Sequence, residues 1–303
     1  MITLTDERGL ISSPKSWEEI VAIAGYVKGL SPSQHKLKSI IGSYHLKNIH
    51  CGLSECNQPH DKGYIALTQS GAVTNMGHVC GRNYFGTDFT TFTNQYNREV
   101  TAQNNRDLLF TFDLQLESLE QELIGLKERK NGANWIYSTS IQLITKGKDC
   151  PDEIVRVLNK MLKARTSMLK SEREATNQEI ETQEAQTGKT LKRPHTVEEN
   201  IAIIVGLEVL YKENDLKDLL IFELLEKIKV FKGLDIEKLP YSELSKYAKW
   251  VNSIDLTREQ IKSSMAAGIS FLNYENLKPL LQILTDKSDI KKFNIFLQQL
   301  KLA

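Results

Sequence analysis

Most of the side chains that could bind a metal ion lie close together near the start of the chain. Three of the four cysteines, Cys51, Cys56 and Cys80, fall within one short stretch, and His60 and His78 lie among them. Thiolate and imidazole are the ligands of structural zinc, which needs four of them in a tetrahedron. In a reducing compartment, clustered cysteines indicate metal binding rather than disulfides. The sequence therefore predicts one structural zinc ion.

The fourth ligand of this ion is one of the two histidines. His60 comes shortly after Cys56 and just before an expected strand. His78 lies only two residues from Cys80, and a ligand pair that close requires a sharply bent backbone. Ligand geometry therefore favours a set of Cys51, Cys56, His60 and Cys80, with His78 as the alternative.

Two other interpretations of the cysteines are weaker. Cysteine packs well as a small apolar residue, so the three could be buried free thiols. Their crowding beside glycines and an expected hairpin favours metal. A catalytic zinc ion is less favoured than a structural one, because four protein ligands leave no open position for water.

No other pattern in the chain indicates an enzyme. Residues 187–190 end like a phosphate-binding loop, but Gln183 stands where the earlier glycine is required and no strand precedes it. Cys150 precedes an expected helix, without a histidine close in sequence, and is interpreted as an ordinary helix-start residue. We expect a non-enzymatic protein.

The elements expected around the cysteines are helices and one hairpin. Ser16 and Glu19 fit a capping box for a first helix, and residues 37–46 can form a second. Residues 64–68 and 72–76 flank Gly71 and predict a short β-hairpin. We expect residues 1–96 to form N-terminal helices and a small zinc-binding β-hairpin module.

The chain from residue 97 onward is expected to be helical. Apolar residues spaced alternately by three and four predict a coiled-coil seam; they are Leu109, Phe112, Leu116, Leu119, Leu123 and Leu126. Asn131–Gly132 breaks it, and a new helix opens at Pro151 and continues as a polar extension to Gln186. We expect these helices to form one long helical or coiled-coil arm over residues 97–195.

A C-terminal helical bundle is expected over 196–303. It opens with a capping box at Thr196 and Glu199. The expected helices are 197–212, 215–231, 240–253, 257–272, 274–285 and 288–301. The predicted fold class is mainly α, with a long helical hairpin or coiled-coil arm and a helical bundle.

Composition limits the function classes. The 303 residues carry a net charge of +1, so there is no bulk attraction to nucleic acid or to an anionic membrane. The first residues lack the basic and apolar regions of a signal peptide, and no apolar run is long enough for a membrane span. We expect a cytoplasmic protein that does not contact a membrane.

One local pattern indicates nucleic-acid binding as an alternative function. Several basic residues fall near one face of the helix expected after Pro151, and others lie in the loop that follows. The candidates are Arg156, Lys160, Lys163, Lys170, Lys192 and Arg193. A charged outer face offset by the acidic segment after it is the simpler interpretation.

Residues 51–89 carry a resemblance to a known group of proteins. The string runs from Cys51 through a hairpin to Asn75-Met-Gly77, Cys80-Gly81 and Phe85-Gly86, and it ends at Phe89. It resembles the small cysteine-containing modules of uncharacterised phage and prophage proteins. The resemblance covers about 40 residues, implies an origin in a mobile element, and carries no assigned activity.

Together these features predict an interaction protein. Helices with an a/d seam commonly associate, so a homo-oligomer is expected. If the chain is phage-encoded, as the resemblance implies, its partner is expected to be a host protein complex such as a defence system, in the host cytoplasm.

Overall fold

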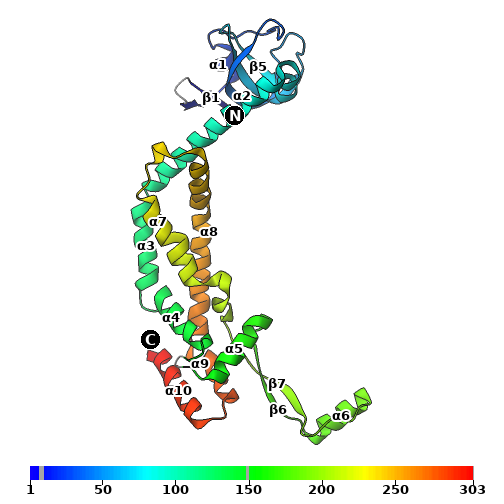
Figure 1. Cartoon of the computed structure of the whole chain (residues 1–303), viewed down its shortest axis with the longest axis vertical. Helices are drawn as coiled ribbons and strands as arrows, with labels where there is room; N and C mark the ends of the chain where they lie inside the picture. The colour runs from blue at the N-terminus through cyan, green and yellow to red at the C-terminus, as the bar shows by residue number, and fades with distance from the viewer. Residues whose placement is uncertain (7–9, 148–149, 303) are drawn as a thin grey trace. The chain divides into compact units, whose positions relative to one another are not determined.

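The computed structural model describes residues 1–6, 10–147 and 150–302 (Figure 1). The fold is mainly α, with an antiparallel sheet near the N-terminus. The chain forms two compact units: unit 1 is Met1–Leu114 with Asp235–Val251, and unit 2 is Gln115–Leu234 with Asn252–Ala303. This division differs from the three consecutive predicted segments because the chain returns to unit 1 after residue 234.

Unit 1 is built on a five-stranded antiparallel sheet in the order β2-β1-β3-β4-β5. Its strands are β1 (Ile2–Thr5), β2 (Ile11–Ser12), β3 (Leu37–His50), β4 (Pro59–Thr68) and β5 (Val73–Gly77). The predicted hairpin is confirmed, because β4 and β5 pair around a turn in which Gly71 has a φ of 84°.

The helices predicted for residues 1–48 are wrong apart from one short helix, α1 (Trp17–Val21). The Ser16 side chain makes no capping bond, and Glu19 Oε1 instead accepts from the Lys15 amide at 3.1 Å. The apolar spacing over 37–46 imitates a helix because β3 has register shifts near Leu37 and Ile40. Such shifts change the phase of the two-residue alternation on which strand prediction rests.

Each face of the sheet has its own apolar cluster. α2 (His78–Asp113) places Phe89 and Tyr96 against one face, where they meet Ile40 and Met76. On the other face Ile20 of α1 packs with residues that include Tyr44, Ile65 and Val73. Successive strand residues therefore face different partners, which fixes the side to which each polar residue of the sheet points.

The second segment of unit 1 comes from residues 235–251. It contains a 3₁₀ turn, η4 (Ile236–Lys238), and the first part of α8 (Tyr241–Phe271). The rings of Trp250 and Phe112 meet edge to face with centroids 5.5 Å apart. The predicted helices 240–253 and 257–272 are one continuous helix.

Unit 2 consists of helices and one two-stranded ribbon. Its first helices are α3 (Leu116–Glu128), α4 (Ala133–Ile144) and α5 (Asp152–Ala164), so the predicted break at Asn131–Gly132 and the start after Pro151 are confirmed. The later elements are η1 (Leu207–Leu210), η2 (Lys212–Asn214), η3 (Asp218–Leu225), α7 (Glu226–Phe231), α9 (Tyr274–Leu277), η5 (Lys278–Ile283) and α10 (Lys287–Leu302).

The predicted coiled-coil seam does not form one continuous helix. α2 ends at Asp113 and α3 begins at Leu116. Leu109, Leu116 and Leu123 are buried within the single chain. These three positions are not available to a second copy, and a seam-mediated homo-oligomer stays a prediction.

The predicted polar helix extension to Gln186 is wrong. α5 ends at Ala164, and Arg165 turns the chain with a φ of 48°. The polar run forms a ribbon of β6 (Met168–Glu174) and β7 (Thr196–Ile203), joined through α6 (Asn177–Thr187) (Figure 1). Thr196 therefore starts a strand and not the predicted helix.

The packing of unit 2 gives a first prediction at two glycines with positive φ. A methyl group at Gly206 (φ 75°) would lie 2.2 Å from the carbonyl oxygen of Ala267, whereas Gly188 (φ 65°) has no atom within 4 Å of that position. We expect Gly206→Ala to lower the free energy of unfolding by about 2–4 kcal/mol, since it adds a clash to left-handed strain. Gly188→Ala should cost about 1 kcal/mol. Urea unfolding followed by circular dichroism measures both, and equal losses would contradict the packing at Gly206.

Candidate metal centre

The three predicted cysteine ligands lie together in unit 1. Cys51 and Cys56 stand in the connection between β3 and β4, and Cys80 lies in the first turn of α2. Their Sγ atoms all lie within 4.8 Å of one another, and Cys56 and Cys80 are 2.9 Å apart. Across residues 1–6, 10–147 and 150–302, these are the side chains gathered closely enough to hold a metal ion.

Backbone amides are directed at two of the three sulfur atoms. The backbone amides of Leu53 and Gly77 donate toward Cys51, and that of Gln58 donates toward Cys56. Amide donors of this kind stabilise thiolate ligands and orient them. Cys51 is buried, whereas Cys56 and Cys80 are partly exposed, so the cluster is open to solvent on one side.

The three thiols differ in how readily they ionise. Burial raises the pKa of Cys51, and burial together with the Cys56 hydrogen bond raises the pKa of Cys80 to about 12. Burial also acts on Cys56, but hydrogen bonds from Cys80, the Gln58 amide and Cys51 outweigh it and lower the Cys56 pKa. A bound cation would have to displace these protons, so the affinity of the cluster for metal should rise with pH.

His60, the preferred fourth ligand, is engaged elsewhere. Its Nε2 atom makes a short hydrogen bond with the Tyr44 hydroxyl, and its Nδ1 lies 3.3 Å from the Gln58 carbonyl oxygen. Burial lowers the His60 pKa, which favours the neutral ring. A neutral ring can donate from Nδ1 and accept at Nε2, so both nitrogens are satisfied without a metal.

His78 does not join the sulfur atoms either. Its exposed ring lies beside the rings of Tyr64 and Phe89, with centroid distances of 6.4 and 5.8 Å. Among the residues that the structure describes, the close group therefore holds three sulfur ligands and neither histidine.

Sequence reasoning missed the buried polar network that positions this centre. Asn75 is fully buried; its Oδ1 accepts from Tyr26 at 2.8 Å, and its Nδ2 donates to Tyr44 at 3.0 Å and to the His50 carbonyl at 2.9 Å. Its own carbonyl accepts from the Gly52 amide at 2.8 Å. The signal in the sequence was Asn75 inside an expected strand of the hairpin, where a buried amide requires such partners.

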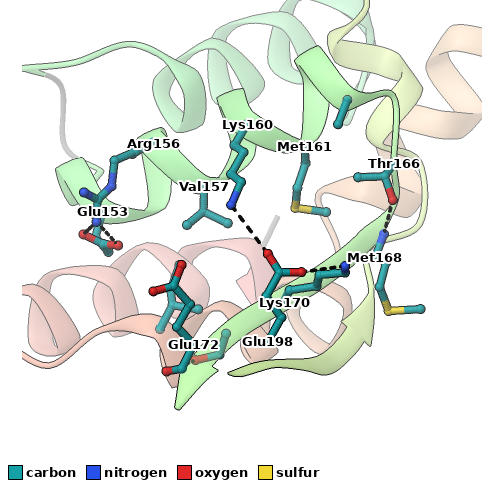
Figure 2. A pocket seen from close by; sticks show the side chains of 13 residues that line it. Glu153, Arg156, Val157, Lys160, Met161, Thr166, Met168, Lys170, Glu172 and Glu198 are labelled. Carbon is teal, nitrogen blue, oxygen red and sulfur yellow. Dashed lines mark hydrogen bonds and ion pairs between the residues drawn. The ribbon is translucent and has the colours of Figure 1, made fainter. Parts of the chain in front are cut away.

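Three of the six basic residues proposed for nucleic acid, Arg156, Lys160 and Lys170, line a groove of about 750 Å³ between α5 and the ribbon (Figure 2). Lys170 belongs to β6 and not to the helix. Arg156 pairs with Glu153, while Lys160 and Lys170 lie 4.0 and 2.7 Å from Glu198. With Glu172 the groove holds as many carboxylates as basic side chains.

The remaining basic candidates give no continuous surface with that groove. Lys163 lies on α5 but does not line it. Lys192 and Arg193 are exposed in the loop between α6 and β7. Because phosphate binding requires uncompensated positive charge, nucleic-acid binding stays a prediction that this arrangement does not favour.

Cys150 is buried, and burial raises its pKa to about 12. A thiol of that kind is unreactive, in line with its interpretation as a helix-start residue.

Comparisons with protein-family models, curated proteins and solved structures gave no match to this chain. None of the described helices combines the length and apolar character that a membrane crossing requires.

The position of His60 gives a second prediction. We expect His60→Ala to keep the metal content of the wild type, because the His60 nitrogens are held by Tyr44 and Gln58. Loss of these hydrogen bonds should destabilise unit 1 by about 1–2 kcal/mol. Elemental analysis of purified protein and denaturant unfolding measure the two effects. His78→Ala is the matched control, and loss of metal from His60→Ala would show that the ring turns toward the sulfur atoms.

Proposed function

We propose that this chain is a non-enzymatic interaction protein whose unit 1 is organised by one zinc ion. The observation that supports the metal is the gathering of Cys51, Cys56 and Cys80 within 4.8 Å, with backbone amides directed at the sulfur atoms. Thiolate ligands select zinc and other soft cations over magnesium or calcium.

The proposed role of the ion is to join two parts of unit 1. It would tie the connection between β3 and β4 to the first turn of α2, which the sequence separates by a complete hairpin. Binding energy gained only in the folded state adds directly to folding stability. The ion would therefore hold the start of α2 against the edge of the sheet.

A structural ion fits these ligands better than a catalytic one. Neither His60 nor His78 belongs to the close group of ligand atoms, so a bound ion would have a fourth position open to water or a partner. Three thiolates around a divalent ion leave a net negative charge, which weakens the attraction on a bound water that hydrolysis requires. His60, a candidate base, is already hydrogen-bonded at both nitrogens.

The proposed binding element is the ribbon of β6 and β7 with α6. Most side chains of both strands are at least partly exposed. Arg173 joins three segments, because its guanidinium pairs with Glu179 of α6 at 2.6 Å and Glu199 of β7 at 3.1 Å. A two-stranded ribbon alone is only marginally stable in water. We therefore propose that a partner covers this polar ribbon and stabilises it. The mobile-element origin and the host defence complex rest on the sequence resemblance alone.

The zinc proposal predicts about one equivalent of zinc per chain in protein purified without chelators. Cys56→Ser should abolish the metal and increase the proteolytic sensitivity of unit 1, because one of only three thiolates is lost. Zinc affinity should fall as the pH is lowered from 8 to 6, since each ligand must lose a proton. Elemental analysis and competition with a chromogenic chelator measure these effects.

Cys150→Ser is the control for this experiment, because it removes a thiol far from the cluster in sequence. Well under half an equivalent of any metal in the wild type would mean that Cys51, Cys56 and Cys80 are merely packed together.

The interaction proposal predicts that charge reversal in the α6–β7 loop weakens partner capture. Lys192→Glu with Arg193→Glu should reduce recovery of a specific protein from a lysate of the source cells about tenfold, since exposed charges at a binding surface steer and fix the partner. Lys229→Glu with Lys291→Glu changes the net charge equally at exposed positions outside the ribbon and should have no effect. Quantitative mass spectrometry measures recovery, and equal recovery with both double variants would exclude this loop as the binding element.

A further inference from the structure

We propose that unit 1 carries a second site, a pocket for the phosphate group of a small molecule, on the face of the sheet that packs against α2. A cavity of about 390 Å³ opens there over β1, β3 and β4, with α2 at its side. This volume lies within the range of small-molecule sites. None of the three cysteines lines this cavity, and the proposal does not rest on the interaction role.

The strand register builds the floor of this pocket. Ser43 of β3 lies opposite Tyr64 of β4, and His45 lies opposite Lys62. Side chains two residues apart on a strand share a face, so these four form a block of two rows. Tyr64 packs against Phe89 of α2, which identifies the face.

A third strand extends the block, because Thr3 of β1 lies opposite Ser43. One row therefore carries three hydroxyl groups, from Thr3, Ser43 and Tyr64. The next row carries the imidazole of His45 and the ammonium of Lys62. All five side chains line the cavity.

α2 supplies two more polar groups at the side of the pocket. Asn97 Nδ2 donates to the Tyr64 hydroxyl at 3.2 Å, which fixes the orientation of that phenol. His78 is the first residue of α2, and its ring lies 6.4 Å from that of Tyr64. The positive end of a helix dipole also favours a nearby anion.

The charge of the pocket selects an anionic ligand. Its lining includes Lys62, His45 and His78 and contains no carboxylate. The groove in Figure 2 differs, since its basic side chains are matched by Glu153, Glu172 and Glu198.

The donors match a phosphate group in particular. A phosphate presents three acceptor oxygens and up to two negative charges. The Lys62 ammonium, an imidazole N–H and the Thr3 and Tyr64 hydroxyls can donate to a ligand, whereas the Ser43 hydroxyl is 3.4 Å from the Tyr96 hydroxyl, which donates to the Thr3 carbonyl. Hydrogen bonds to charged oxygens are the strong ones. The cavity is open to solvent, and its volume of about 390 Å³ suits a phosphate monoester of the size of a mononucleotide.

Isothermal titration of the full chain with AMP, inorganic phosphate and adenosine tests the proposal. We expect AMP to bind and adenosine to give no heat, because the phosphate provides the recognised charge. Inorganic phosphate that binds as tightly as AMP would assign the pocket to the phosphate group alone and supports the proposal. Weaker binding of inorganic phosphate supports recognition of the whole ester.

Lys62→Gln should weaken AMP binding at least tenfold. Lys47→Gln, an exposed position on β3 outside the lining, should leave it unchanged, and circular dichroism confirms that both variants fold. The proposal is overturned by adenosine binding as tightly as AMP, by wild-type affinity in Lys62→Gln, or by no binding of AMP or phosphate at millimolar concentration.

Discussion

Unit 1 depends on the buried amide of Asn75. An unpaired amide inside a protein costs several kcal/mol, so this residue is compatible with only one arrangement of its neighbours. Its side chain bonds Tyr26, Tyr44 and the His50 carbonyl, and its own carbonyl accepts from Gly52. These bonds fix the loop after β3 against β5, and thereby place Cys51 beside the turn that leads to Cys80.

The sequence predicted what depends on local chemistry. The cysteine cluster and the hairpin around Gly71 could be predicted from the sequence, because metal-ligand types and turn residues are recognised within a few neighbouring positions. The helix break at Asn131–Gly132 and the helix start after Pro151 could be predicted for the same reason.

Strand β3 could not be predicted, because its register shifts give Leu37, Ile40 and Tyr44 a helix-like spacing. The ribbon of β6 and β7 was missed because strands with little buried surface have no apolar period to detect.

The hydrogen bonds of His60 show a further limit of prediction from sequence. Its ring nitrogens are satisfied by Tyr44, sixteen positions earlier, and by a backbone carbonyl. The Tyr44 contact cannot be found from spacing, since it depends on the register between β3 and β4. The net charge of the chain likewise does not predict local charge. A chain with a net charge of +1 holds both a groove of balanced charges and a pocket without a carboxylate.

The metal centre and the pocket share one pair of strands but not the same contacts. Between them β3 shifts register, from His45 opposite Lys62 to Ile49 opposite His60. The two rows of the pocket lie before this register shift in β3. Their alignment is fixed there by the pairing of Ser43 with Tyr64 and of Tyr44 with Gly63. The cysteines lie beyond it, in the connection to β4 and on α2. Removal of a metal ion would therefore loosen the connection and the start of α2, while the paired strands that form the pocket floor keep their register.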